Sequence, residues 1–177
     1  MSQDTTTQPT PEPAPRIDPV QLQFAIEQLR SHQNLLGAIL AGAAGAAAGA
    51  GLWAGVTLAT GYQIGWMAVG IGFLVGFAVR GVGKGIDRVF GFLGAGLALL
   101  GCAAGNLLAV CAMIAGQEGI PFLDLLSRLD LTVTQELMVA SFSPMDVLFY
   151  GIAVYEGYKL SFRQLTQEEI RTLLPGA

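Results

Sequence analysis

The segment Leu35–Val79 reads LLGAILAGAAGAAAGAGLWAGVTLATGYQIGWMAVGIGFLVGFAV, and it contains no Asp, Glu, Lys, Arg or His. A helix that crosses ~30 Å of hydrocarbon needs roughly 20 apolar residues. A run of 45 residues is therefore too long for one crossing and suits two. The uncharged turn Thr60–Gln63 divides the run near its middle. The segment predicts a transmembrane hairpin with spans at about 35–59 and 63–79.

The composition of the whole chain also indicates a membrane protein. Hydrophobic residues make up 53% of the chain and the mean hydropathy is +0.56, and both values are higher than in average soluble proteins. Charged residues make up 12%, which is lower than the soluble average. The formal charge is −4, and the chain has no basic, aromatic-studded stripe of the kind that follows a nucleic-acid backbone. We therefore expect the lipid bilayer as a partner and no nucleic acid.

Two further spans follow the hairpin. The uncharged run Val89–Gln117 predicts a span at about 89–115. The sequence Ser-Pro-Met-Asp then starts a fourth span at about 144–160, because Ser can cap a helix, Pro suits its first turn and Asp faces the positive end of the helix dipole. Glu156 interrupts this span. The predicted fold class is an all-α membrane protein with four transmembrane helices in a domain covering 35–160.

The segments outside the spans have different compositions. Residues 1–19 are rich in Thr, Gln and Pro and predict a disordered cytoplasmic tail, whereas residues 20–34 predict an amphipathic helical collar at the headgroups or leading into the first span. Two apolar patterns at helical spacing predict a pair of short amphipathic helices in the external segment 116–143. The cytoplasmic C-terminal tail, 161–177, should contain a short helix that starts near Thr166.

The Lys and Arg residues predict the orientation, since cytoplasmic loops of membrane proteins carry an excess of both. If the N-terminus is inside, eight of the nine Lys and Arg residues face the cytoplasm, and Arg128 alone lies outside. The external segment instead carries four acidic residues. An odd number of spans would move the basic C-terminal tail to the outside. We therefore predict that both termini are cytoplasmic.

Polar residues within or beside the spans are the candidate site residues, because such groups are costly in hydrocarbon. Asn106 lies near the middle of the third span, and we expect it to hydrogen-bond to a neighbouring helix. Glu156 lies about one turn inside the fourth span, with Lys159 on the same face. We expect an ion pair of Glu156 with Lys159 or Arg80, and a proton or ion relay is the alternative. Asp146 is interpreted as a helix-start charge.

The turn after the hairpin is basic. It carries Arg80, Lys84 and Arg88 in a glycine-rich sequence. A phosphate-binding P-loop would need Gly at Ala78 and Ser or Thr at Gly85, and neither is present. The turn is therefore interpreted as a flexible basic segment that can contact anionic lipid headgroups.

Small residues recur every fourth position in three of the spans. Such faces let helices approach closely in a medium that offers no hydrophobic drive for association. Internal packing of one bundle is the favoured interpretation, and homo-oligomerisation or docking of another membrane protein is the alternative. The glycines of these faces are Gly45, Gly49, Gly72, Gly76, Gly101 and Gly105.

The sequence shows no catalytic constellation. His32 is the single histidine, and Cys102 and Cys111 lie about half a turn apart in azimuth on one helix, so they cannot pair there. We therefore expect no metal, no cofactor and no enzymatic activity. The leading hypothesis is a scaffold or accessory subunit that acts through helix–helix packing. The alternative is a subunit of a small transporter or channel that uses Glu156 near the cytoplasmic face.

Two segments carry a resemblance. These are ATGYQIGWMAVGIGFLVGFAVRGVGKGID, residues 59–87, and SPMDVLFYGIAVYEGYKLSFR, residues 143–163. They resemble a group of uncharacterised bacterial multi-pass membrane proteins over roughly residues 35–165. The resemblance implies a bacterial inner-membrane location and supplies no activity.

Overall fold

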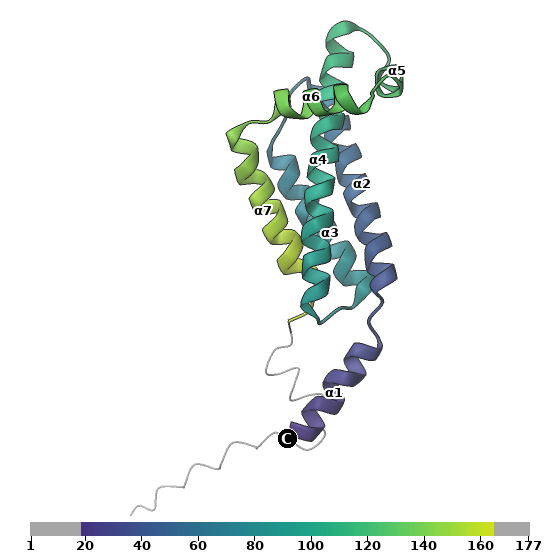
Figure 1. Ribbon diagram of the computed structural model, residues 1–177, viewed down its shortest axis with the longest axis vertical. Helices are drawn as coiled ribbons and strands as arrows, with labels where there is room; N and C mark the ends of the chain where they lie inside the picture. The colour runs from purple at the N-terminus through teal and green to yellow at the C-terminus, as the bar shows by residue number, and fades with distance from the viewer. Residues whose placement is uncertain (1–18, 165–177) are drawn as a thin grey trace, which may run out of the picture.

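The computed structural model describes residues 19–164, and this part of the chain is helical without β-strands. Four helices form a bundle, two short ones lie across one end of it, and one projects from the other end (Figure 1). The all-α class is therefore confirmed for the described residues. In chain order the helices are α1 (Pro19–Ser31), α2 (Leu35–Thr60), α3 (Trp66–Gly83), α4 (Arg88–Glu118), α5 (Phe122–Ser127), α6 (Leu131–Ser141) and α7 (Pro144–Leu160).

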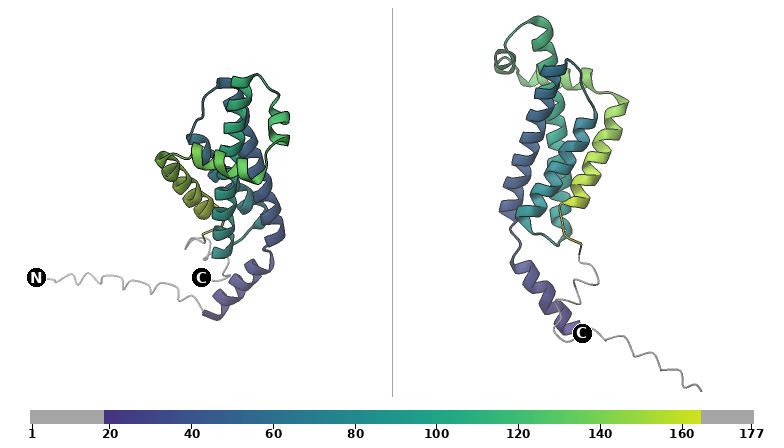
Figure 2. Two further views of the ribbon diagram at one scale, coloured as in Figure 1. Left: turned by 45° about the horizontal axis from the view of Figure 1, so that its top comes forward. Right: turned by 180° about the vertical axis from the view of Figure 1, so that it is seen from behind.

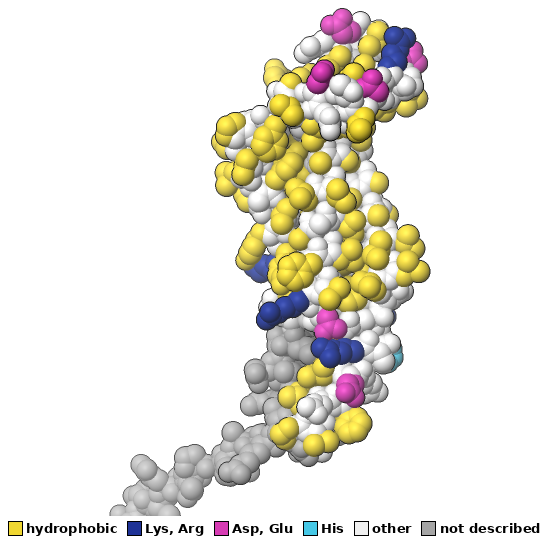
Figure 3. Space-filling view, viewed as in Figure 1, with side chains coloured by type: hydrophobic (Ala, Val, Ile, Leu, Met, Phe, Trp, Pro, Cys, Tyr) yellow, Lys and Arg dark blue, Asp and Glu magenta, His cyan; other side chains and the backbone are white. Residues whose placement is uncertain are grey.

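Three helices are long and apolar enough to cross a membrane. They are α2 with 26 residues, α3 with 18 and α4 with 31. The fourth bundle helix, α7, has only 17 residues, and it reaches the length of a span only together with α6, from which it is bent by 100°. Apolar side chains cover much of the face of the bundle that Figure 3 shows. The fold is that of an integral membrane protein with three to four spanning helices.

The helix ends are set by local polar groups and by backbone conformation. Asn34 caps α2 by accepting a hydrogen bond from the Gly37 N–H at 2.8 Å. Gly61 ends the same helix with a left-handed φ of 70°. The next helix starts at Trp66, three residues after the expected start of the second span, and continues to Gly83. The left-handed residue after α3 is Lys84, a non-glycine residue with a φ of 48°.

The two central helices of the bundle are α3 and α4, and α2 and α7 flank them on opposite sides (Figure 2). The interfaces are close because they contain glycine and alanine. A Cβ added to Gly101 of α4 would lie 3.0 Å from the Ala46 Cβ of α2, and one on Gly72 of α3 would lie 2.8 Å from the Ala153 Cα of α7. Larger side chains such as Trp53 and Ile71 are buried between these contacts.

The N-terminal collar is not continuous with the first span. α1 ends at Ser31, and the chain changes direction over His32–Asn34 before α2 begins. The N–H of His32 donates to the Leu29 carbonyl and that of Gln33 to the Arg30 carbonyl, which closes the last turn of α1. The collar is therefore a separate helix, and it has no buried residue. Of the tail predicted at 1–19, only Pro19 is described, and it is the first residue of α1. Residues 1–18 and the predicted helix near Thr166 lie outside the described residues.

Candidate functional site

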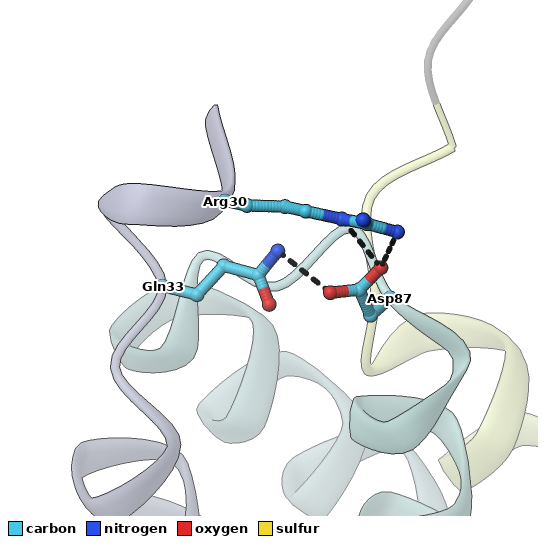
Figure 4. A network of polar contacts seen from close by, with 3 residues as sticks. All are labelled: Arg30, Gln33 and Asp87. Carbon is cyan, nitrogen blue, oxygen red and sulfur yellow. Dashed lines mark hydrogen bonds and ion pairs between the residues drawn. The ribbon is translucent and has the colours of Figure 1, made fainter. Parts of the chain in front are cut away.

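An ion pair attaches α1 to the turn between α3 and α4 (Figure 4). The Asp87 Oδ1 accepts hydrogen bonds from Arg30 at 2.9 Å (Nη2) and 3.2 Å (Nε), and its Oδ2 accepts one from the Gln33 Nε2 at 3.1 Å. Asp87 precedes α4 in the N-cap position, but its carboxylate makes no capping hydrogen bond. Sequence reasoning missed this contact because Arg30 and Asp87 are 57 residues apart and no local pattern joins them.

A cavity of about 580 Å³ lies beside this attachment. Of the three basic residues predicted in the turn, Arg80 and Lys84 line it and Arg88 does not. Arg163, from the segment after α7, is held there by a 2.8 Å hydrogen bond from its backbone N–H to the Gly85 carbonyl. The described residues that line it are Leu29, His32, Arg80, Gly81, Lys84, Ile86 and Arg163. The fold thus adds α1 and the C-terminal segment to the basic turn.

The predicted ion pair of Glu156 with Lys159 or Arg80 is wrong for the described part of the chain. The one ion pair found there joins Arg30 and Asp87. The Lys159 ammonium instead lies 5.5 Å from the centroid of the Tyr155 ring, in a cation–π arrangement. Glu156 is half-buried, and its backbone carbonyl lies 3.3 Å from where a Cβ on Gly76 would be. The backbone of Glu156 therefore packs against α3, while its side chain makes no hydrogen bond to another described residue.

Asn106 connects three parts of the fold at the opposite end of the bundle. Its side chain is fully buried, accepts a hydrogen bond from the Gln63 Nε2 and donates one to the Ser141 Oγ at 3.1 Å. Gln63 belongs to the turn between α2 and α3, and Ser141 is the last residue of α6. The predicted hydrogen bond therefore exists, but only one of the two partners lies on a helix, and Asn106 is level with the turn rather than at mid-depth.

Asp146 has the helix-start role that the sequence indicated. Its Oδ2 accepts a 2.8 Å hydrogen bond from the Ser143 N–H, while the Ser143 Oγ accepts one from the Met145 N–H at 3.3 Å. These reciprocal bonds form a capping box at the start of α7. A second cavity of about 250 Å³ adjoins it, lined by Gln63, Gly65, Ser141, Ser143, Met145, Asp146 and Phe149.

The six glycines of the predicted small-residue faces lie against other helices of the same chain. A Cβ on Gly49 would lie 2.7 Å from the Ile71 Cγ1, and one on Gly105 would lie 2.8 Å from the Trp53 Cε3. The other four, Gly45, Gly72, Gly76 and Gly101, have neighbours from another helix at 2.5–3.3 Å. These glycines are therefore used within one copy of the chain.

The geometry assigns the chain to a class, that of helical integral membrane proteins. Comparison with protein-family models, with curated proteins and with solved structures finds no match. Among residues 19–164, no three His, Cys, Asp or Glu side chains are grouped so that they could hold a metal ion. Any more specific function has to be inferred from the surfaces of the bundle.

Proposed function

We propose that this protein is a non-enzymatic membrane scaffold or accessory subunit that acts through helix–helix contacts of α2. The observation that carries the proposal is that α2 has small residues on two faces. One face packs against α3 and α4 through residues that include Gly49. The outward face, which is exposed, presents Ala44, Ala48, Gly51 and Gly55. A Cβ on either of these two glycines would meet nothing within 4 Å.

The occupant that we propose for this outward face is α2 of a second copy of the chain. Within the protomer, α2 already packs against the parallel helix α4, with Gly101 against Ala46 and Gly105 against Ala50. Two copies inserted in the same orientation would place their α2 helices parallel to each other, around a two-fold axis along the membrane normal. Small residues spaced four apart allow the close approach that such a pair needs.

Leucine in place of Gly51 and Gly55 should convert the assembly to monomers, because two bulky side chains would hold the paired helices apart. The measurement is native mass spectrometry of the full chain in mild detergent. Gly70→Leu is the matched control, since Gly70 is exposed on α3 and also has nothing within 4 Å. The proposal fails if the unaltered protein is monomeric, or if Gly70→Leu dissociates it equally. Substitution of Gly45 or Gly49 is unsuitable here, because both face α3 of the same chain.

We further propose a bacterial inner-membrane location with both termini cytoplasmic. The charges of the fold support this orientation. Arg30, Arg80, Lys84 and Arg163 gather at one end of the bundle. Acidic side chains predominate at the other end, around α5 and α6 (Figure 3). An excess of Lys and Arg marks the cytoplasmic side of membrane proteins.

A reporter that is active only in the cytoplasm should work when it is fused after Ala177 and should fail when it is inserted near Glu118. A periplasmic reporter at the same two positions should give the opposite pattern. This result is expected because an even number of crossings separates the two termini, and the α4–α5 connection lies across the membrane from them. Identical readings at the two positions would exclude the proposed topology.

The alternative of a transporter or channel subunit has less support. The buried polar side chain Asn106 is engaged by Gln63 and Ser141 near one end of the bundle. Glu156 lies toward the other end of α7, and most buried residues between the two levels are apolar, among them Val75, Ala98 and Ala153. The buried Tyr150 hydroxyl in this region donates its hydrogen bond to the Cys102 carbonyl. The described part of one protomer therefore offers no continuous row of polar groups for an ion or solute.

A further inference from the structure

We propose that the cavity beside α1 is a binding site for the phosphate group of an anionic amphiphile, such as a phospholipid headgroup. Its volume of about 580 Å³ lies within the range of ligand pockets, ~300–1,000 Å³, and exceeds what an inorganic phosphate ion alone would fill. Arg80 and Lys84 supply cationic donors from the end of α3, and Arg163 adds a third cation from the C-terminal segment. Arg and Lys are the side chains that bind phosphate most often.

Arg80 and Lys84 face no carboxylate among the described residues that line the cavity. Asp87 is the nearest acid in sequence, but both of its oxygens already accept hydrogen bonds from Arg30 and Gln33. Arg80 and Lys84 make no ion pair with another described residue. An anion that enters the cavity would therefore meet positive charge that the described part of the protein does not neutralise.

The position of the cavity favours an amphiphile over a fully soluble anion. It lies where the spanning helix α3 ends, at the level expected for lipid headgroups. Leu29 and Ile86 contribute apolar surface beside the cations. The ligand chemistry that matches both features is a phosphate next to an apolar chain. Lipid is therefore the favoured source of the phosphate.

Lys84 occupies a backbone conformation that favours glycine. Its φ of 48° is the only positive value outside glycine among residues 19–164. Gly83 and Gly85 flank it, so the chain has a lysine where glycine would adopt the left-handed conformation without a steric penalty. Lys84→Gly should therefore remove the ammonium group while it keeps or improves the stability of the turn. This makes it a suitable variant for testing binding separately from folding.

The test compares lipid binding to the full chain and to the double variant Arg80→Gln, Lys84→Gly. Native mass spectrometry in neutral detergent follows titrations with phosphatidylglycerol, with phosphatidylcholine and with inorganic phosphate. Removing two cations near a membrane surface should weaken phosphatidylglycerol binding by about thirtyfold. Phosphatidylcholine, which has no net charge, should bind weakly to both proteins. Arg88→Gln is the control, since Arg88 is exposed, lies four residues from Lys84 and does not line the cavity.

The outcomes separate the two sources of phosphate. Loss of phosphatidylglycerol binding in the double variant but not in Arg88→Gln supports the site with lipid as its ligand. Saturable binding of inorganic phosphate that the double variant also loses supports the same site with a soluble source. An equal loss in Arg88→Gln would show that diffuse surface charge is responsible, and it would overturn the proposal, as would equal binding by all three proteins. Because α2 is unchanged throughout, failure here leaves the proposed self-association standing.

Discussion

Leucine in place of Gly72 should detach α7 from the bundle. A Cβ at this position would lie 2.5 Å from the carbonyl oxygen of Ala153 and 2.8 Å from its Cα. Both neighbours are backbone atoms, so no rotation of a side chain can make room. Overpacking usually costs about 1–3 kcal/mol, and a clash with backbone belongs at or above the upper end of that range. The measurement is the free energy of unfolding in mixed micelles titrated with a denaturing detergent.

Gly70 provides the control for this substitution. It lies two residues away on the same helix and is exposed, and a Cβ there would meet nothing within 4 Å. Gly70→Leu also replaces a glycine inside α3 by leucine, so it reports the effect of the exchange without the clash. We expect it to leave the free energy of unfolding unchanged or to raise it slightly, since glycine is a poor helix former. Equal destabilisation by both variants would contradict the packing of α7 against Gly72.

Alanine in place of Trp53 should produce the second large loss of stability. Trp53 is 1% exposed, and its ring packs on the face of α4 where Gly105 leaves room. Replacing a buried Trp by Ala costs ~3–5 kcal/mol in soluble proteins. We expect a loss in the lower part of this range. If α2 separates from the bundle in a membrane, its tryptophan passes into lipid rather than water, so the variant loses packing contacts but little hydrophobic transfer free energy. The same detergent titration measures the change.

Two further variants test the physical reason for this expectation. Trp53→Phe keeps most of the ring and removes the indole N–H, which is buried without a hydrogen-bond partner in the described structure. It should therefore cost much less than the alanine variant, because the lost packing is partly offset by removal of an unsatisfied donor. Trp66→Ala is the control at an exposed tryptophan, which contacts Phe149 with ring centroids 5.2 Å apart. If Trp66→Ala were as destabilising as Trp53→Ala, burial of Trp53 would not be the cause.

The sequence alone determined the features that depend on short, continuous stretches. The uncharged runs predicted α2, α3 and α4, because the thickness of the hydrocarbon sets the length of apolar sequence that a span requires. The start of α7 was also predictable, since the capping box joins Ser143 and Asp146, which are only three residues apart. The same holds for the basic turn, which is visible as Arg80, Lys84 and Arg88 in one short segment.

The contacts between distant segments were not predictable in this way. Asn106 bonds to Gln63, which lies 43 residues away, and the buried amide gave a reason to expect a partner but not its identity. Glu156 and Lys159 lie at a spacing that permits an ion pair. In the structure, Lys159 lies over Tyr155 instead, because several partners are within reach of a long side chain and local spacing does not choose among them.

The sequence by itself therefore determined that this is a helical membrane protein and where its long helices run, because the bilayer imposes those properties on each segment separately. Only the tertiary structure decided which face of each helix is used. It showed that Gly49 faces inward and Gly55 outward, and that Arg80 and Lys84 share a cavity while Arg88 lies outside it. The sequence alone does not distinguish one glycine from another, or one basic residue from another. Their roles differ because helix packing brings different neighbours to each one.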